Sequence, residues 1–325
     1  MAFTRESLRI DCRRVCAEVI AALQQQVRHR LRRRGAVVCV SGGIDSSVTA
    51  ALCVRAFGPE RVRALALPER DSSPESLAYA QLLCNHLALD LVVESIGAAL
   101  EAQGCYARRD DAVRAAIPEY GDGWKMKLVL GHGLLETGRL NVFRVRAEGP
   151  DGVTREERVS LDSYLAIVAA TNMKQRTRMV RAYYHAEALN YAHVGSHNRD
   201  EYVLGFMVRY GDIGVDCMPI GLLYKTQVYE LAAHLGLPEV IRTQTPTSDT
   251  YSAQQSQEEF FFALPFSVLD PLLYAWEHDV PAPEAAMGLG LSAEGVERAY
   301  RDFESKVRST QHMRELPLLV GSPPR

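Results

Sequence analysis

The stretch from residue 36 to residue 57, AVVCV-SGGIDSS-VTAALCVRAF, decides the fold. Residues 36–40 form a continuous apolar run, which is typical of a β-strand covered on both faces. Residues 44–57 are compatible with a helix. The turn between them holds two glycines and several hydroxyl groups, so backbone N–H groups and the positive end of the helix can approach a phosphate. The stretch therefore predicts a phosphate-binding loop between a buried strand and a helix.

Strands and helices alternate outward from this loop. Apolar runs predict strands over 36–40, 61–67, 90–94 and 192–195, and periodic segments predict helices over 5–34, 44–57, 74–87, 161–190, 201–206 and 225–235. This order predicts a single α/β domain over residues 1–325, with a doubly wound, mostly parallel sheet and helices on both faces. The alternation breaks between residues 104 and 160, where runs at 140–146 and 154–161 flank a turn and predict an inserted β-hairpin. A helical, irregular segment is predicted over 254–325.

Composition limits the partners and the compartment. The net charge of −3 argues against a nucleic-acid partner, because no basic field covers the chain. The seven cysteines are scattered and lack the spacing of a zinc site, which favours free thiols in a reducing compartment. The sequence shows neither an N-terminal signal segment nor a run of about 18 apolar residues. We therefore expect a cytoplasmic protein with no membrane partner.

Asp45 is the unusual residue of the loop, since a carboxylate repels phosphate unless a cation lies between them. It indicates a bound Mg²⁺ that bridges to phosphate oxygens. The lysine of the usual P-loop and the Gly-x-Gly-x-x-Gly turn of dinucleotide-binding folds are both missing. The loop instead resembles the Ser-Gly-Gly-x-Asp-Ser loop of the ATP pyrophosphatases, which hold the pyrophosphate of ATP. This resemblance implies the ATP-binding residues Ser41, Gly42, Gly43, Ile44, Asp45, Ser46 and Ser47.

A second block, between residues 171 and 230, carries more charge and amide groups than a buried helix needs. Its segments read NMKQRTRM (172–179), GSHNRDE (195–201), VRYGDIGVD (208–216) and LYKTQVYE (223–230). Taken singly, each segment could be a solvated helix face or a turn. Together they supply several cations and a carboxylate, which suits a polyanionic substrate and a metal ion.

In order and spacing these motifs resemble the ammonia-dependent NAD synthetases, from the loop to about residue 270 and apart from the break at 104–160. The resemblance implies an adenine nucleotide alpha hydrolase-like fold. Asp45 and Glu201 would be the Mg²⁺ ligands, and Lys225 would join them in catalysis. Ser196, Lys225 and Thr247 would contact ATP, with Ser196 in place of the threonine that is usual in the family.

The same resemblance implies the substrate contacts. Arg176, Arg209 and Asp216 would hold the dinucleotide, with Arg209 in place of a lysine that is common in the family. Part of the segment 254–325 would close over the substrate as a lid, through His312 and Arg314. The family has a His-Lys-Arg segment there, and Met313 replaces its lysine, so this lid lacks one cation.

The implied reaction is the ATP-dependent amidation of nicotinic acid adenine dinucleotide (deamido-NAD) by ammonia. The substrate carboxylate would attack the α-phosphorus of ATP, and ammonia would attack the resulting acyl-adenylate to give NAD and AMP. The resemblance implies Mg²⁺ as cofactor, ATP as co-substrate and a homodimer. A glutamine-hydrolysing domain does not fit in this length, so nitrogen is expected as free ammonia or from a separate amidotransferase.

Other functions fit parts of the sequence. The insertion and the altered lid are compatible with a related ligase that adenylates a different carboxylate. A nucleotide-binding protein without catalysis would not need both Asp45 and Glu201. A tRNA-thiolating enzyme would need a cysteine pair and a basic surface, and neither is evident. The stretch PEYGDGWK (118–125) is compatible with a substrate loop or with an ordinary turn.

Overall fold

A four-stranded parallel sheet lies at the centre of the computed structural model, which describes residues 3–130, 143–244, 251–253 and 255–321. The strand order is β3-β2-β1-β7. All adjacent pairs are parallel, so the carboxyl ends of the four strands lie along one edge. The bounds are β1 (Ala36–Cys39), β2 (Val62–Ala66), β3 (Leu91–Val93) and β7 (Ala192–Val194).

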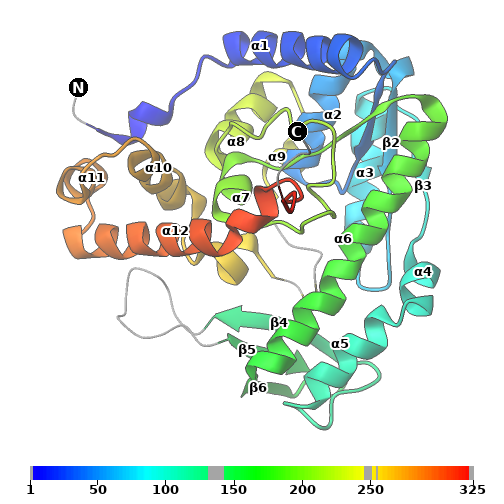
Figure 1. Cartoon of the computed structure of the whole chain (residues 1–325), viewed down its shortest axis with the longest axis vertical. Helices are drawn as coiled ribbons and strands as arrows, with labels where there is room; N and C mark the ends of the chain where they lie inside the picture. Colours follow the sequence, from blue (N-terminus) through cyan, green and yellow to red (C-terminus); the bar gives the residue numbers. More distant parts are fainter. Residues whose placement is uncertain (1–2, 131–142, 245–250, 254, 322–325) are drawn as a thin grey trace.

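Helices cover both faces of this sheet (Figure 1). Ala36 and Val38 pack with α1, α2 and α8 on one face, whereas Val37 packs with α4, α5 and α6 on the other. Successive residues of β1 thus alternate between two buried surfaces, which confirms the predicted doubly wound α/β fold. The helices are α1 (Cys12–Gln24), α2 (Ile44–Phe57), α3 (Pro74–His86), α4 (Gly97–Ala102), α5 (Cys105–Arg114), α6 (Leu161–Leu189), α7 (Arg199–Leu204), α8 (Lys225–His234) and α9 (Glu239–Arg242).

The single helix predicted over residues 5–34 is wrong. A short 3₁₀ helix at Arg5–Leu8 precedes α1, and a π-helical turn at Gln25–Arg30 follows it. Asp11 separates the first two, because its carboxylate accepts the backbone N–H groups of Arg13 and Arg14 at 3.0 and 3.1 Å. An aspartate that caps a helix in this way stops the chain from continuing as one helix through it.

The insertion contains the predicted hairpin and one more strand. β5 (Phe143–Glu148) and β6 (Thr154–Arg158) pair antiparallel, with a turn at residues 149–153. β4 (Lys125–Leu130), which the sequence analysis did not predict, pairs with the other edge of β5. Residues 140–142 of the predicted first strand lie outside the described residues. The three-stranded sheet buries its own apolar cluster against α5 and the start of α6.

Three helices follow residue 265: α10 (Phe266–Glu277), α11 (Ala282–Leu289) and α12 (Ala293–Arg314). They form a separate apolar cluster around Leu272, Phe262 and Phe303. A π-helical segment at Glu258–Phe262 leads into α10. Figure 1 shows α12 reaching back to α7. Of the helices that the structure describes, none combines the length and the apolar content that a bilayer crossing requires.

Burial of His193 in β7 makes stability depend on pH. Burial lowers the pKa of this imidazole to about 4, and its Nδ1 lies 3.1 Å from the carbonyl oxygen of Gly214. In the unfolded chain the imidazole of His193 binds a proton near pH 6.5, whereas in the folded chain it stays neutral down to about pH 4. The contribution of His193 to stability should therefore fall as the pH drops from 6.5 to 4, by up to about 3 kcal/mol. Urea unfolding at several pH values should show this contribution as the difference in pH dependence between the wild type and His193→Asn.

Candidate active site

The glycine-rich loop lies where β1 ends and α2 begins. Gly43 is the N-cap of α2, and no side chain caps the N–H groups of the first turn. Gly42 has a φ of +78°, a conformation that L side chains rarely adopt. A Cβ at Gly42 would lie 2.5 Å from the Cβ of Tyr79 and 2.9 Å from the carbonyl oxygen of Ser76, both on α3. The loop is therefore shaped for close backbone approach, as the sequence predicts.

The serines of the loop mainly hold the loop itself. Ser46 and Ser47 are buried, and both hydroxyls donate to the carbonyl oxygen of Gly43, at 3.1 and 2.8 Å. Ser41 is exposed, and its hydroxyl accepts the N–H of Gly43 at 3.3 Å. Ser41 thus presents its hydroxyl at the surface, while the buried Ser46 and Ser47 hold the loop through the Gly43 carbonyl oxygen.

Asp45 and Lys225 form an ion pair at the start of α2. Lys225 is the first residue of α8, and its side chain is completely buried. Burial opposes its charge, but the carboxylates of Asp45 and Glu201 raise the pKa of Lys225 above its ordinary value. Lys225 therefore remains a cation, and 180 residues of sequence separate it from its partner.

Asn198 connects the two predicted metal carboxylates. Its side-chain Nδ2 donates to Asp45 at 3.1 Å, and its Oδ1 accepts the N–H of Glu201 at 3.0 Å. The backbone N–H of Asn198 in turn donates to Glu201 at 3.2 Å, which completes a capping box at the start of α7. This completely buried amide holds Asp45 and Glu201 in one hydrogen-bonded unit.

Several charged side chains lie close together around this hydrogen-bonded unit and shift one another's pKa values. Burial and the charge of Asp45 raise the pKa of Glu201 to about 7. Burial opposes protonation of His197, but the carboxylates of Asp212, Glu201 and Asp45 raise its pKa to about 9. His197 is therefore a second buried cation, and its Nε2 lies 3.6 Å from Asp212.

The pair Asp45 and Glu201 fits a hard divalent cation. Carboxylates are the donors that Mg²⁺ prefers, and a cation held by this pair would relieve the repulsion by which Asp45 raises the pKa of the buried Glu201. Among the residues that the structure describes, no group of three His, Cys, Asp or Glu side chains is placed to hold a metal. Asp45 and Glu201 are therefore the candidates for this ion.

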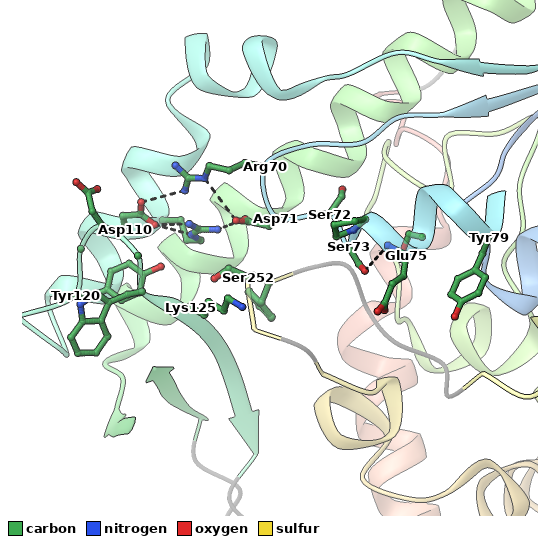
Figure 2. Close-up of a pocket in the computed structure, with 18 of the residues that line it drawn as sticks. Arg70, Asp71, Ser72, Ser73, Glu75, Tyr79, Asp110, Tyr120, Lys125 and Ser252 are labelled. Carbon is green, nitrogen blue, oxygen red and sulfur yellow. Dashed lines mark hydrogen bonds and ion pairs between the residues drawn. The ribbon is translucent and has the colours of Figure 1, made fainter. Parts of the chain in front are cut away.

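A cavity of about 770 Å³ lies beside α3, the helix that contacts the loop at Gly42. Ser76 and Tyr79, which contact the position of Gly42, line one part of it, and the insertion lines the opposite part through Tyr120, Trp124 and Lys125. Figure 2 shows Tyr79 and Tyr120 at opposite ends of this pocket. The stretch 118–125, left open between a substrate loop and a turn, thus lies on the wall of the cavity beside the loop.

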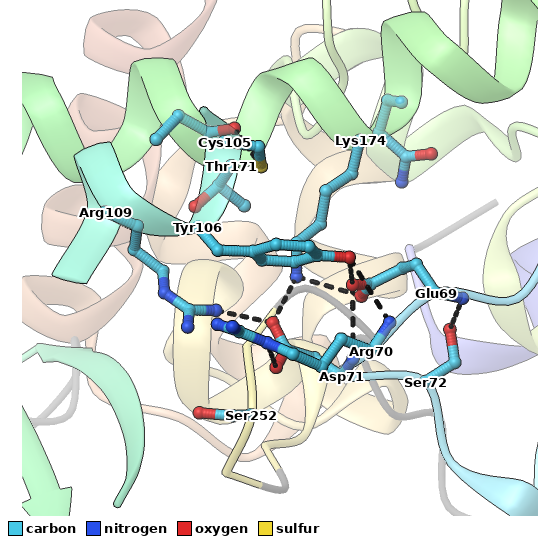
Figure 3. Close-up of polar contacts among 12 residues, drawn as sticks. Glu69, Arg70, Asp71, Ser72, Cys105, Tyr106, Arg109, Thr171, Lys174 and Ser252 are labelled. Atoms are coloured by element: carbon cyan, nitrogen blue, oxygen red, sulfur yellow. Dashed lines mark hydrogen bonds and ion pairs between the residues drawn. The ribbon is translucent and has the colours of Figure 1, made fainter. Parts of the chain in front are cut away.

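A buried ion network supports the floor of this cavity (Figure 3). Lys174 of α6 donates to Glu69 at 2.9 Å and to Asp71 at 2.7 Å, and Arg109 of α5 also pairs with Asp71. Tyr106 donates its hydroxyl to Glu69 at 2.8 Å. Although burial raises it, the pKa of Asp71 is lowered overall by Lys174 and Arg109. The network fixes the chain after β2, where the cavity begins.

The predicted substrate contacts are spread over the surface around α6 and α7. The Arg176 side chain donates to the Arg209 carbonyl oxygen at 3.2 Å, and the Arg209 side chain donates to the Glu315 carbonyl oxygen at 3.2 Å. Asp216 accepts the N–H of His193 at 2.8 Å and the hydroxyl of Tyr183 at 3.1 Å. Each of these three side chains thus already has a contact that orders the fold.

The remaining predicted residues differ in what surrounds them. Ser196 is half-buried, two residues after β7 and two residues before Asn198. His312 is exposed at the end of α12, whereas Arg314 donates to the carbonyl oxygens of Tyr202 and Val307, both at 3.0 Å. Thr247 lies outside the described residues. Arg314 therefore attaches α12 to α7.

Replacement of Asn198 by alanine should lower kcat about tenfold or more, because the orientation of both carboxylates depends on its amide. Loss of the N-cap should also cost about 1 kcal/mol of stability. Steady-state kinetics and urea unfolding measure the two effects separately. Asn198→Ser, which keeps a capping oxygen without reaching Asp45, should recover stability but not kcat. Equal recovery of both would contradict the bridging role.

The chain matches one family over most of its length. The NAD synthase family model matches residues 15–116 and 153–317, and so leaves out residues 117–152 of the insertion. The NH(3)-dependent NAD(+) synthetase of Mesorhizobium japonicum is 47% identical over 312 residues, which cover 96% of this chain and 98% of the relative. That of Thermotoga neapolitana is 37% identical over 244 residues, with coverage of 75% and 78%.

Solved structures share the fold. The NMN synthetase from Francisella tularensis aligns with a TM-score of 0.65 at 21% identity, over 96% of this chain and 99% of that one. The NH3-dependent NAD synthetase from Campylobacter jejuni aligns with a TM-score of 0.62 at 21% identity, over 96% and 100%. The order of the strands, the loop at Asp45 and the sequence matches therefore agree on one conclusion: the chain belongs to the NAD synthase family.

Proposed function

We propose that this protein is an ammonia-dependent NAD synthetase, a ligase that amidates deamido-NAD and converts ATP to AMP and pyrophosphate. The observation that carries the proposal is the convergence of Asp45, Glu201 and Lys225 beside the uncapped start of α2. Such a set binds a triphosphate and stabilises charge on the departing pyrophosphate. The family match and the identity of the relatives support the substrate assignment.

In the first step the carboxylate of deamido-NAD attacks the α-phosphorus of ATP, and pyrophosphate leaves. The N–H groups at the start of α2 and the ammonium group of Lys225 bind the negative oxygens that develop. Asp45 and Glu201 would hold Mg²⁺, which would neutralise phosphate charge when bound. In the second step ammonia attacks the acyl-adenylate carbon, AMP leaves, and one proton is released. No protein nucleophile is needed, because the substrate carboxylate attacks.

The cavity next to the loop suits the nucleoside end of ATP. It starts where α3 contacts Gly42 and is lined by Tyr79, Tyr120 and Trp124, which offer aromatic faces. ATP with its phosphates on the loop would extend its adenosine toward this wall. Ser41, Ser196 and Thr247 complete the proposed phosphate contacts, while Arg176, Arg209, Asp216, His312 and Arg314 are the proposed contacts of the dinucleotide.

The assembly and the setting complete the proposal. Leu161, Leu165, Val180 and Tyr184 are exposed along α6, with exposed fractions of 53 to 70%, and such a surface favours association of two copies. Light scattering should therefore give the mass of a dimer. All seven cysteines are free thiols, which fits the cytoplasm. Ammonia would arrive free or from a separate amidotransferase.

Replacement of Asp45 by asparagine tests the proposal. Purified wild type, ATP, Mg²⁺, deamido-NAD and ammonium should yield NAD, AMP and pyrophosphate in equal amounts. Asp45→Asn should lower this rate by about 10²-fold or more, because one of the two metal carboxylates is lost. Asp302→Asn, which removes a carboxylate from a partly buried ion pair with Lys306 within α12, is the matched control and should keep the wild-type rate. Wild type that binds ATP without forming NAD would instead favour a different carboxylate substrate.

A further inference from the structure

The insertion does more than line the cavity, because its edge strand holds a segment that is distant in the sequence. The N–H of Met126 in β4 donates to the Ser252 hydroxyl at 2.9 Å, and the N–H of Ala253 donates to the Met126 carbonyl oxygen at 3.0 Å. The side chain of Gln255 donates to the Leu128 carbonyl oxygen at 2.6 Å. Ser252 lies next to Lys125, the first residue of β4, in Figure 2. This segment thus covers the edge of β4 that β5 leaves open.

Burial strengthens this attachment. Tyr251 belongs to the apolar cluster of the insertion together with Met126 and Leu128. Gln255 is 2% exposed, so its bond to β4 is shielded from water. Residues 251–253 and Gln255 are therefore fixed by the insertion through both apolar packing and hydrogen bonds.

Two residues beyond Gln255, the same segment contacts Glu201 through Gln257. The Nε2 of Gln257 donates to Oε1 of Glu201 at 3.1 Å. The other carboxylate oxygen of Glu201 accepts the backbone N–H of Asn198. Each oxygen of this buried carboxylate thus has its own donor, and the plane of the carboxylate is set by two elements, α7 and the segment that β4 holds.

We infer that Gln257 is a positioning residue for Glu201, and that β4 of the insertion sets the place of Gln257. This inference rests on the proposed role of Glu201 as a metal carboxylate. Residues that hydrogen-bond a ligating carboxylate typically change metal affinity or activity 10- to 100-fold when they are lost. The insertion, whose residues 117–152 the family model does not match, thereby supports the reaction from outside the matched residues.

Replacement of Gln257 by leucine tests the first part, because leucine is similar in size and cannot donate. We expect kcat for NAD formation to fall about tenfold, while KM for deamido-NAD stays within twofold. Binding of Mn²⁺ in the presence of ATP, followed by the EPR signal of free Mn²⁺, should weaken about tenfold. Gln257→Glu, which replaces the donor by a carboxylate, should be impaired at least as much.

A double-variant comparison separates positioning from a general structural effect. Gln257→Leu should have little further effect on kcat or Mn²⁺ affinity once Glu201 is replaced by glutamine, because both changes act through the same carboxylate. Ser252→Ala should show a smaller loss of the same kind, in kcat rather than in KM. Arg155→Gln, which removes an exposed ion pair between β6 and Glu119, is the matched control and should behave as the wild type.

The outcomes are distinct for the two proposals. Wild-type kcat and Mn²⁺ affinity in Gln257→Leu or Gln257→Glu would overturn the inference while leaving the proposed function intact. The inference would also be overturned if Gln257→Leu lowered kcat and Mn²⁺ affinity as much in the Glu201→Gln variant as it does in the wild type. If Glu201→Gln itself forms NAD at the wild-type rate, the role of Glu201 fails and the inference fails with it.

Discussion

Replacing Lys225 by methionine is expected to lower kcat for NAD formation about 10²- to 10³-fold. Lys225 places its ammonium group beside Asp45 and Glu201, and in the proposed mechanism it binds the charge that develops on the departing pyrophosphate. The loss of one preorganised donor of this kind from a buried site has effects of this size. KM for deamido-NAD should change much less, because the proposed contacts of the dinucleotide lie elsewhere. Initial rates at saturating ATP measure the effect.

The same substitution should destabilise the fold, since it leaves the carboxylate of Asp45 without its buried partner. Breaking a buried ion pair from one side costs about 3 kcal/mol. The double variant Asp45→Asn/Lys225→Met removes both charges and should recover a large part of this loss in urea unfolding. A double variant no more stable than Lys225→Met would show that the ion pair does not set the stability. Near wild-type kcat in Lys225→Met would remove Lys225 from the mechanism.

Replacing Gly42 by alanine is expected to have the second large effect. The φ of +78° is strained for alanine, and the new Cβ would lie 2.5 Å from the Cβ of Tyr79 and 2.9 Å from the carbonyl oxygen of Ser76. The contact with Ser76 is to backbone, so α3 must shift as a whole. We expect a loss of about 2 kcal/mol or more in stability. ATP affinity should fall more than tenfold, because the loop and the cavity wall move together.

Gly43 supplies the matched control. Its φ of −74° is ordinary for any residue, and a Cβ there would meet only the hydroxyl oxygen of Ser41, at 3.3 Å. Gly43→Ala should therefore stay within about 1 kcal/mol of the wild type in stability. Calorimetric titration with ATP and urea unfolding compare the two variants. Equal stability of Gly42→Ala and Gly43→Ala would show that the contact with α3 does not constrain the loop.

Local pattern was enough to predict the central sheet and most of its helices. α2 spans the predicted residues 44–57, because a buried apolar run, a glycine pair and an uninterrupted helical segment all lie within one short stretch. β4 was not predicted, because its second neighbour is the segment near Ser252, 126 residues away along the chain. A short strand with one neighbour that distant leaves only a weak signal in its own sequence.

The sequence named residues of the candidate site but not the hydrogen bonds and ion pairs that join them. Asp45, Glu201 and Lys225 could be named because the family motifs carry them. Asn198 could not be given a role, since the bond to Asp45 spans 153 residues and forms only when the fold brings the start of α7 to the start of α2. His197 lies within the motif GSHNRDE, but its charge could not be predicted. The carboxylates that raise its pKa, those of Asp212, Glu201 and Asp45, are brought to it only by the fold.

One helix takes part in two hydrophobic cores, and this shapes how the protein folds. Near its start α6 contributes Ile167 to the core of the insertion, and near its end it contributes Ala182 and Ala186 to the core of the central sheet. Neither core can be completed without this helix, so both depend on the formation of α6. The insertion gains an anchored support on which its strands can assemble, which reduces the chain entropy lost when they pair. The sheet of the insertion is therefore supported by a helix that lies wholly within the part of the chain that the family model matches.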